Sequence, residues 1–539
     1  MADLTADYIV VGAGVTGCVI ASRLAQNYQK PKVILVEAGS DPSSEPAAAG
    51  LLSGLSLQGG KFDYADASEP VPTTANRVHT LSSGNALGGG SILNYGGWLW
   101  ADAADYNEWA KIVGDERWSY EGLKPWIRRT ECLQDAGASE FSEHGLAGPM
   151  HITSISSTAE RKYPLREPVK NAWLELGVSP NKQNGSIGGL NEMYENSRGG
   201  MRQPSYMAYP LTDVQVLTNC LVDKVTFTDR TATGVQLADG RKISSRKEVV
   251  LCAGAYRTPP ILMRSGVGPL DILEKYGIPV TYESPHVGQN LHDHFATYLA
   301  FRLRDPSAGY ALGSPSWRNP ALFQGLPWDW VINQSLPPEM LVKHKFESEE
   351  DKEARNLYEV LTVYVPPGIP GIPIDGTHIA TSIMLLLPNS RGTVSIRSSI
   401  ANDSPIIQPN FFSTPLDRDT LVHAVRQTLK AMLTTTQMKS IVEGETPPLG
   451  PGLDGLTPLT ADTSAGVIEE RIRRTGMQHF HSGGTAAMGK VVDVDGRVFG
   501  IKGLRVADAS IVPIPLGGHP QATLYAMAER LASDISHET

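Results

Sequence analysis

The first forty residues follow a pattern of apolar and polar positions that is typical of a βαβ unit. Residues 8–11 form a short apolar run, a glycine-rich turn follows at 12–17, and apolar residues then recur at helical spacing from 18 to 28. A second apolar run at 32–36 ends at Glu37. Short apolar runs bounded by turn residues predict buried strands, and the helical spacing between them predicts a helix. We therefore expect a strand, a glycine turn, a helix and a second strand.

Similar patterns return later along the chain, with β-rich stretches between them. They predict strands at residues 215–228, 247–252, 377–387, 392–396 and 504–507. They predict helices at residues 258–264, 417–433 and 522–535, and a solvated helix face for the charged run 347–355. Because α/β segments occur at both ends and in the middle of the sequence, we expect two interleaved domains rather than two consecutive ones.

The N-terminal glycine turn also carries a chemical signal. Gly12, Gly14 and Gly17 have the G-x-G-x-x-G spacing of a dinucleotide-binding turn, and Glu37 lies 20 residues after Gly17. The first glycine permits the tight turn, the second lets the backbone approach a pyrophosphate, and the third lets helix and strand pack closely. The helix N-terminus offers N–H groups to the phosphates, and Glu37 is placed to accept from a ribose hydroxyl. A carboxylate there disfavours the 2′-phosphate of NADP, but the turn alone leaves FAD and NAD both open.

Composition narrows the class of protein. Of the 539 residues, 41% are hydrophobic and 19% are charged, which is typical of a globular protein. The net charge of −10 argues against nucleic acid as a partner, and no apolar run approaches the roughly 20 residues of a membrane-spanning helix. The four cysteines are scattered without metal-like spacing. The first residues carry no basic segment of a signal peptide, so we expect an intracellular, cytoplasmic protein without membrane association.

Two histidines near the C-terminus are the strongest candidates for catalysis. His481 lies in the run FHSGGTAAMG and His519 in PLGGHPQAT, and the glycines and small residues around them let a ligand approach the backbone closely. Histidine is the side chain that titrates near neutral pH without perturbation. The pair is therefore suited to general acid–base catalysis.

Separated blocks of this sequence together resemble the glucose–methanol–choline (GMC) family of flavin oxidoreductases. The blocks are the N-terminal glycine turn with Glu37, residues 84–94 (GNALGGGSILN), 254–268 (GAYRTPPILMRSGVG) and 287–294 (VGQNLHDH), and a C-terminal part with His481, Asp508 and His519. The resemblance covers nearly the full length of the chain, and the order of the blocks makes it specific.

The resemblance implies an α/β fold, α+β overall, and the cofactor FAD. A Rossmann-like FAD-binding domain would be interleaved with a substrate domain built on an antiparallel β-sheet with helices. The expected ranges are 1–155, 206–295 and 462–539 for the FAD-binding domain, and 156–205 and 296–461 for the substrate-binding domain.

The resemblance also implies a set of site residues. His481 and His519 match the catalytic positions of the family. The residues that match cofactor-binding positions are Gly12, Gly14, Thr16, Gly17, Glu37, Ser91, Asn94, Tyr95, Gly96, Gly97, Val222, Asp508, Ala509, Pro520 and Gln521. Because Leu93 stands where some members tether flavin through a histidine, we expect FAD to be bound non-covalently.

Residues beside these blocks are expected to have supporting roles. Tyr95, Trp98 and Phe480 are expected to line a substrate pocket, and Trp328 and Trp330 are candidates for an access loop. The family block at 292–294 implies a structural role for its two histidines rather than a metal site. Since the family motif places the catalytic residue at 481, we expect His479 to pack.

The implied reaction is the oxidation of a small primary or aromatic alcohol to an aldehyde or ketone. His481 would take the hydroxyl proton, His519 would hydrogen-bond the same oxygen, and a hydride would pass to flavin N5. Oxygen or another acceptor would reoxidise the flavin. The sequence specifies neither the substrate nor the oligomeric state.

Other activities of the same scaffold remain open at this point. The GMC family contains hydroxynitrile lyases, in which flavin is present but not redox-active, and a histidine pair serves that acid–base chemistry as well. A fatty-acid photodecarboxylase fits the two histidines less well, because the pair suits alcohol chemistry. A non-enzymatic binding role would leave the pair without a purpose.

Overall fold

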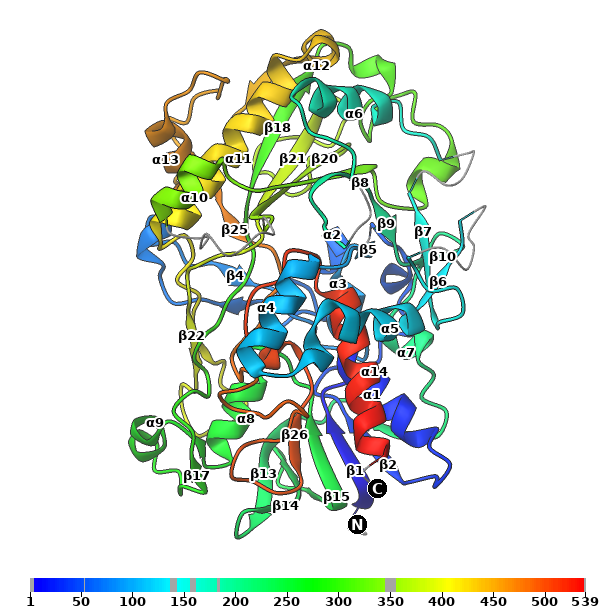
Figure 1. Cartoon of the computed structure of the whole chain (residues 1–539), viewed down its shortest axis with the longest axis vertical. Coiled ribbons are helices and arrows are strands. Elements are labelled where there is room, and N and C mark those ends of the chain that lie inside the picture. Colours follow the sequence, from blue (N-terminus) through cyan, green and yellow to red (C-terminus); the bar gives the residue numbers. More distant parts are fainter. Residues whose placement is uncertain are drawn as a thin grey trace.

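Two seven-stranded sheets organise the protein, whose structure is a computed structural model describing residues 4–52, 54–135, 143–155, 161–181, 185–344 and 355–537. In Figure 1 the first sheet lies at the lower end of the long axis, together with both termini, and the second sheet lies at the upper end. Most of the charged run at 347–355, for which we predicted a helix face, lies outside the described residues.

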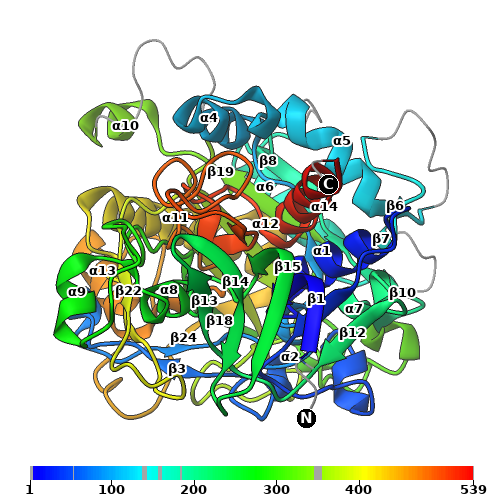
Figure 2. The same cartoon turned by 90° about the horizontal axis from the view of Figure 1, so that it is seen from below.

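The first sheet contains the predicted βαβ unit. Its order is β12 (Val214–Leu217), β2 (Val33–Val36), β1 (Leu4–Val11), β15 (Lys242–Leu251), β14 (Thr231–Leu237) and β13 (Val222–Thr228), and β26 (Leu504–Val506) also pairs with β15. The strands β12, β2, β1, β15 and β26 pair in parallel, whereas β13, β14 and β15 form an antiparallel meander. Figure 2 shows β1, β15, β14 and β13 side by side from below.

Helices from the two ends of the chain pack together on this sheet. Helix α1 (Val15–Ala25) contacts β1 and β2, and it packs against α14 (Gln521–His537), which also contacts α5 (Tyr120–Thr130). One face of α1 is fully buried because Cys18, Val19 and Ile20 have no exposed surface. Parallel strands covered by helices are buried on both sides, which is why β2 and the second half of β1, residues 8–11, are unbroken apolar runs.

The second sheet is antiparallel throughout. Its order is β24 (Val442–Thr446), β18 (Phe295–Leu303), β21 (His378–Leu385), β20 (Tyr358–Val363), β19 (Trp330–Gln334) and β8 (Gly189–Glu192), with β25 (Met477–Gln478) paired to β18. Helix α11 (Pro415–Leu433) packs on β20 and β21, and its N-terminus is capped by the side chain of Thr414. The match between α11 and the predicted helix at 417–433 reflects its amphipathic spacing and this cap.

Shorter elements connect the two sheets. The short strands are β3 (Asp66–Ala67), β4 (Thr80–Leu81), β5 (Gly97–Trp98), β6 (Glu131–Leu133), β7 (Met150–Ser154), β9 (Tyr194–Glu195), β10 (Ser197–Arg198), β11 (Met201–Arg202), β16 (Val267–Gly268), β17 (Tyr282–Glu283), β22 (Thr393–Ser395) and β23 (Ile406–Gln408). The remaining helices are α2 (Gly54–Leu57), α3 (Gly90–Leu93), α4 (Ala103–Val113), α6 (Arg166–Glu175), α7 (Ser205–Ala208), α8 (Thr258–Arg264), α9 (Leu270–Lys275), α10 (Pro338–His344), α12 (Thr436–Ile441) and α13 (Ala465–Thr475). Helix α8 has the predicted bounds.

The strands of the two sheets interleave along the sequence, as the pattern of elements predicts. The C-terminal boundary differs from the expected one at residue 462, because α13 packs on α11 and β25 pairs with β18 of the second sheet. The apolar face of α13 holds this segment on the second sheet, since Ile468 and Ile472 are fully buried there. We therefore propose that the last crossing between the domains follows Gln478.

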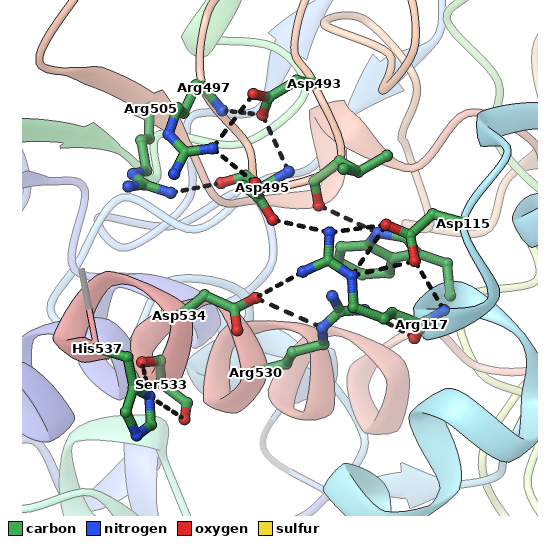
Figure 3. A network of polar contacts seen from close by, with 12 residues as sticks. Asp115, Arg117, Asp493, Asp495, Arg497, Arg505, Arg530, Ser533, Asp534 and His537 are labelled. Atoms are coloured by element: carbon green, nitrogen blue, oxygen red, sulfur yellow. Dashed lines mark hydrogen bonds and ion pairs between the residues drawn. The ribbon is translucent and has the colours of Figure 1, made fainter.

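A network of ion pairs holds α14 to two distant segments (Figure 3). Arg117 contacts Asp115 at 2.7 Å, Asp495 at 3.0 Å and, on α14, Asp534 at 3.9 Å. The Asp115 carboxylate beside Arg117 raises the pKa of that guanidinium. Because the Arg117 side chain is 47% exposed, each of its pairs contributes about 0–1 kcal/mol. The network fixes the position of the helix more than it stabilises the fold.

The carboxyl ends of the parallel strands meet at one edge of the first sheet. There β1 leads into the glycine turn, β2 into Glu37, β15 into the turn at 252–254, and β26 into Asp508. In open α/β sheets, ligands bind in the crevice outside these ends. The strand order therefore places the dinucleotide site between the two sheets.

Candidate active site

A cavity of about 730 Å³ lies between the carboxyl ends of the first sheet and the second sheet. The first sheet and its turns contribute Gly12, Gly14, Glu37, Val222 and Asp508, among others. The second sheet contributes Tyr298 from β18, Leu361 and Val363 from β20, and Ser382 from β21. The predicted nucleotide turn and both predicted catalytic histidines line this one cavity.

The glycine turn is shaped for the close approach of a ligand. Gly12 has φ +96°, and a Cβ atom there would lie 2.7 Å from the carbonyl carbon of Cys252. A Cβ atom on Gly89 would lie 2.6 Å from Cα of Gly14, so the two loops can meet this closely only because residue 89 is glycine. No side chain caps the N-terminus of α1 at Gly14, which leaves its N–H groups to a ligand. These features fit the pyrophosphate of a dinucleotide.

Glu37 is held rigidly at the edge of this turn. Its Oε2 accepts from the backbone N–H of Ala13 at 2.7 Å, and its Oε1 accepts from that of Gly39 at 2.8 Å. Burial raises the pKa of the carboxyl to about 7, against the opposing effect of these hydrogen bonds. Since Glu37 lines the cavity, its remaining lone pairs can accept from a ribose hydroxyl, which fits the adenosine half of FAD.

Most of the predicted site residues line this cavity. They are Gly12, Gly14, Thr16, Glu37, Asn94, Tyr95, Gly96, Gly97, Val222, Phe480, His481, Asp508, Ala509, His519, Pro520 and Gln521. Gly17 lies beneath the turn, where a Cβ atom would collide with the carbonyl oxygen of Gly12, so its role is close packing. Trp328 also lines the cavity, whereas Trp330 packs under Arg166 with the guanidinium 4.3 Å from its ring.

Besides Gly17, two further predicted site residues do not line the cavity. The Ser91 hydroxyl donates to the carbonyl of Gly88 at 2.6 Å and accepts from the N–H of Ser205, so it braces the loop from behind. Trp98 is fully buried and donates through Nε1 to Glu131 at 2.7 Å. Side chains alternate across a strand, and in β5 it is Gly97 that faces His519 while Trp98 points into the core. The prediction that Trp98 lines the pocket is therefore wrong.

A hydrogen-bonded bridge holds the loop beside the flavin position against the segment that carries His519. Asn94 donates through Nδ2 to Oε1 of Gln521 at 3.1 Å, and the Gln521 amide donates to the carbonyl of Gly97. Arg202 donates to Oδ1 of Asn94 at 2.8 Å. The predicted cofactor-binding residues Asn94 and Gln521 thus orient one another.

The structure brings the two predicted catalytic histidines together. The ring centroids of His481 and His519 are 5.2 Å apart, and both rings line the cavity. The backbone N–H of His481 donates to Oδ1 of Asp293 at 2.7 Å, and the preceding residue, Phe480, has φ +64°. This left-handed residue lies two positions after the end of β25 and directly before His481.

His294 sets the protonation of His481. His294 Nε2 lies 3.0 Å from the carbonyl oxygen of Leu516, and its Nδ1 lies 2.9 Å from Nδ1 of His481. A carbonyl oxygen only accepts, so Nε2 of His294 carries the proton. Burial, reinforced by His479 and His519, holds the pKa of His294 well below its usual value. A neutral His294 must then accept at Nδ1, and the donor is Nδ1–H of His481.

This chain of hydrogen bonds leaves Nε2 of His481 without a proton. Burial, followed by the neighbouring His294 and His519, also holds the pKa of His481 well below its usual value, so the ring is neutral. A neutral imidazole with its hydrogen on Nδ1 has a free lone pair on Nε2. Such an atom can act as a general base.

His519 has a different partner. Its Nε2 lies 2.9 Å from Oε1 of Glu359, whose side chain is 1% exposed and lies on β20. The carboxylate accepts the N–H of His519 and stabilises positive charge on the ring. Oε2 of Glu359 has no hydrogen-bond partner among the described residues. The sequence did not lead us to predict Glu359 or the role of His294. The available signal for Glu359 was that it is the one acidic residue in the apolar run LYEVLTV.

His479 lies closer to the site than predicted. It lines the cavity, its ring is 5.2 Å from that of His481, and it stacks on Tyr298 at 6.3 Å. Burial and the nearby His519 lower its pKa to about 3. Within the described ranges, no group of three His, Cys, Asp or Glu side chains is arranged to hold a metal ion. No helix in the same ranges is long and apolar enough to cross a membrane.

Comparison with known proteins identifies the family. Residues 6–296 match the model of the GMC oxidoreductase N-terminal domain, and residues 388–528 match that of the C-terminal domain. The chain is a GMC oxidoreductase. The GMC-type oxidoreductase acuG of Aspergillus aculeatus is 37% identical, and the alignment covers 98% of both chains. The oxygen-dependent choline dehydrogenase of Pectobacterium carotovorum is 30% identical over 98% of this chain and 94% of its own.

Solved structures of other GMC oxidoreductases share the fold. The formate oxidase of Aspergillus oryzae superposes with a TM-score of 0.89 at 26% identity, over 99% of each chain. Pyridoxine 4-oxidase superposes with a TM-score of 0.83 at 25% identity, over 98% of this chain and 99% of its own. A fungal aryl-alcohol oxidase is similar in fold alone, with a TM-score of 0.79 and 23% identity over 99% of each chain. The Rossmann-like part of this GMC oxidoreductase is thus an FAD-binding fold.

Proposed function

We propose that this GMC oxidoreductase oxidises a neutral primary or aromatic alcohol to an aldehyde or ketone, with His481 as the general base. The observation that carries the proposal is the hydrogen-bonded chain from Leu516 through His294 to His481, which leaves Nε2 of His481 free to take a proton. Bound FAD would supply the oxidant, since flavin N5 accepts a hydride from the carbinol carbon.

The two histidines have unequal tasks in this proposal. His481 takes the hydroxyl proton, because its neutral tautomer is set by His294. His519 donates Nε2–H to Glu359, and in its imidazolium form it also donates Nδ1–H to the substrate oxygen. When His481 becomes charged, the buried Glu359 carboxylate behind His519 offsets part of the added positive charge.

The walls beyond the histidines support a neutral, apolar substrate. The segment 401–405 between β22 and β23 adds one acidic side chain, Asp403, to the cavity lining. The lining residues from β18, β20, β21 and the loops at 327–328 and 365–368 are Tyr298, Pro327, Trp328, Leu361, Val363, Val365, Pro367, Gly368 and Ser382. None of these described residues is charged. Burying an unpaired charge against such walls is unfavourable, so an anionic or cationic substrate fits less well than an aromatic alcohol.

We further propose that FAD is held non-covalently and that oxygen or another acceptor reoxidises it. Leu93, directly before Asn94, lines the cavity with an apolar side chain that cannot form a tether. Denaturation of the purified protein should release all of its FAD into the supernatant. Flavin that stays with the precipitated chain would contradict this part of the proposal.

The reaction is tested by mixing the yellow protein anaerobically with a panel of primary and aromatic alcohols while flavin absorbance is followed. Bleaching by at least one alcohol is expected. Persistent yellow colour across the panel, with release of cyanide from aromatic cyanohydrins, would instead support a hydroxynitrile lyase.

His481→Ala tests the base. We expect this variant to keep FAD and to lose most of the rate of flavin reduction, because Nε2 is the proton acceptor. The matched variant His423→Ala removes a half-buried histidine on α11, away from the cavity, and should reduce flavin at the wild-type rate. Wild-type reduction kinetics in His481→Ala would remove this residue from the mechanism.

A further inference from the structure

The cavity lining includes a group of polar residues that the proposed reaction does not use. They are Tyr64 and Asp66 from the segment around β3, and Arg257 and Arg264 from the start and end of α8. Arg264 donates through Nε to the carbonyl oxygen of Asp223 at 3.0 Å, next to the adenine-contact candidate Val222. This contact associates the group with the adenosine end of the expected cofactor site.

Arg257 joins two segments that are far apart in the sequence. Its Nη2 donates to both carboxylate oxygens of Asp66, at 3.0 and 2.8 Å, and its guanidinium lies 3.9 Å from the ring centroid of Tyr64. The Asp66 side chain is 1% exposed and that of Arg257 is 17% exposed. A largely buried ion pair with a stacked aromatic ring fixes the guanidinium in one orientation.

Both segments are anchored independently of this contact. Asp66 pairs with Leu81 between β3 and β4, and the N–H of Tyr64 donates to the carbonyl of Ser83 at 2.9 Å. On the other side, Asp508 accepts from the N–H of Gly254 at 2.9 Å and so holds the turn that leads to Arg257. The ion pair is thus a bridge between two fixed walls of the cavity.

One donor of this bridge lacks an acceptor. Nη1 of Arg257 is buried and has no hydrogen-bond partner among the described residues. A buried N–H left without an acceptor costs about 1–3 kcal/mol, and a charged group costs more. Because Arg257 lines the cavity, a bound molecule can supply the missing acceptor.

Tyr64 relates this donor to Glu37, the expected ribose contact, since it stacks on Arg257 and all three side chains line the same cavity. Burial raises the pKa of Tyr64 to about 12, with the charge of Arg257 acting against this shift and that of Glu37 adding to it. Both charges therefore lie within electrostatic reach of the same phenol. The adenosine half of FAD carries ring nitrogens, ribose hydroxyls and phosphate oxygens, all of which can accept from a guanidinium.

We propose that Arg257 binds the adenosine half of FAD through Nη1, and that its ion pair with Asp66 holds the guanidinium in the orientation that this contact needs. The Asp66 carboxylate occupies Nη2 and leaves Nη1 to the ligand. Loss of the contact therefore speeds release of the cofactor.

The proposal is tested by cofactor binding and does not depend on turnover of any substrate. Arg257→Met keeps the apolar stem and removes both the bridge and the free donor. We expect FAD to leave the diluted holoprotein about 10- to 150-fold faster, as flavin fluorescence reports, because a hydrogen bond to a charged group is worth about 1.5–3 kcal/mol. Arg257→Lys keeps the charge beside Asp66 with fewer donors and should release FAD at an intermediate rate.

Two comparisons separate this role from a general loss of structure. Arg23→Met removes a partly buried arginine that pairs with Glu529 outside the cavity, and it should leave FAD release unchanged. Reconstitution with FMN, which lacks the adenosine half, should be equally tight in Arg257→Met and wild type. Unchanged FAD release in Arg257→Met, or an equal weakening of FAD and FMN, would overturn the proposal. If Arg257→Met does not fold, Asp66→Asn must speed FAD release for the proposal to stand.

Discussion

His294 offers the sharpest test of the catalytic geometry. The variant His294→Leu removes the acceptor that holds the Nδ1–H of His481, 2.9 Å away. His481 is then free to carry its proton on Nε2, the atom that should take the substrate proton. His294→Asn is the matched variant, because its side-chain oxygen can occupy the position of Nδ1 and accept the same hydrogen bond.

The size of the effect follows from the lost acceptor. An unsatisfied buried donor costs about 1–3 kcal/mol, and this amount favours the unproductive tautomer of His481. Since about 1.4 kcal/mol changes a rate tenfold, flavin reduction should slow by about 5- to 150-fold in His294→Leu. The binding of FAD should not change, because His294 contacts His481 and Leu516 rather than the nucleotide turn.

Stopped-flow reduction of the flavin by a saturating alcohol, without oxygen, measures this step directly. His294→Asn should recover most of the rate. His292→Leu is a control for burial, since His292 is also buried and contacts a backbone carbonyl, that of Val512, but not His481. The reasoning is refuted if His294→Leu is reduced at the wild-type rate, or if His292→Leu slows the reaction as much.

Three further predictions concern charge and stability. Glu359→Gln keeps a hydrogen bond to His519 but removes the negative charge, so flavin reduction should slow about tenfold or more with FAD content unchanged in absorbance spectra. Burial holds the pKa values of His292 and His479 at about 3, whereas the unfolded chain takes up these protons near pH 6.5, so the melting temperature should fall as the pH is lowered from about 6.5 toward 3. Glu37, whose pKa burial raises to about 7, acts in the opposite direction and makes this decline shallower. A melting temperature that rises from pH 6.5 down to pH 4 would contradict this. Glu529→Ala removes a carboxylate that is 1% exposed and pairs with Arg23 at 2.6 Å, so urea unfolding should show a loss of about 3 kcal/mol while the rate of flavin reduction stays unchanged.

Local patterns were sufficient to predict much of the fold. The strand before the glycine turn, the helix at 258–264 and the amphipathic helix ending at residue 433 all formed where spacing and turn residues predicted them. These elements are determined by residues that are close to one another in the sequence. The contacts of α13 with α11 could not be predicted, because the helix has no local feature that tells which sheet will bury its apolar face; the domain boundary after Gln478 that we propose rests on them.

The site was predictable only in part for a related reason. The motifs place His481 and His519 in glycine-rich loops, and the imidazole side chains of the two residues suggest acid–base chemistry. Glu359 lies 160 residues from His519 and meets it only through the pairing of β20 with β19 and β21. Trp98 stands next to a cavity-lining glycine in the sequence, but the alternation of side chains in β5 turns it toward Glu131.

By itself, the sequence determined the family, the glycine turn, the acidic end of the second strand and the two histidines, because each is written in consecutive residues. Only the tertiary structure decided which nitrogen of His481 carries no proton. This depends on its contact with His294 and on the contact of His294 with the carbonyl oxygen of Leu516, and both partners are distant in the sequence. The tertiary structure also decided that Arg257 meets Asp66 at the edge of the cavity. Burial and contact between distant segments set the protonation and orientation of side chains, and neither can be read from their order in the chain.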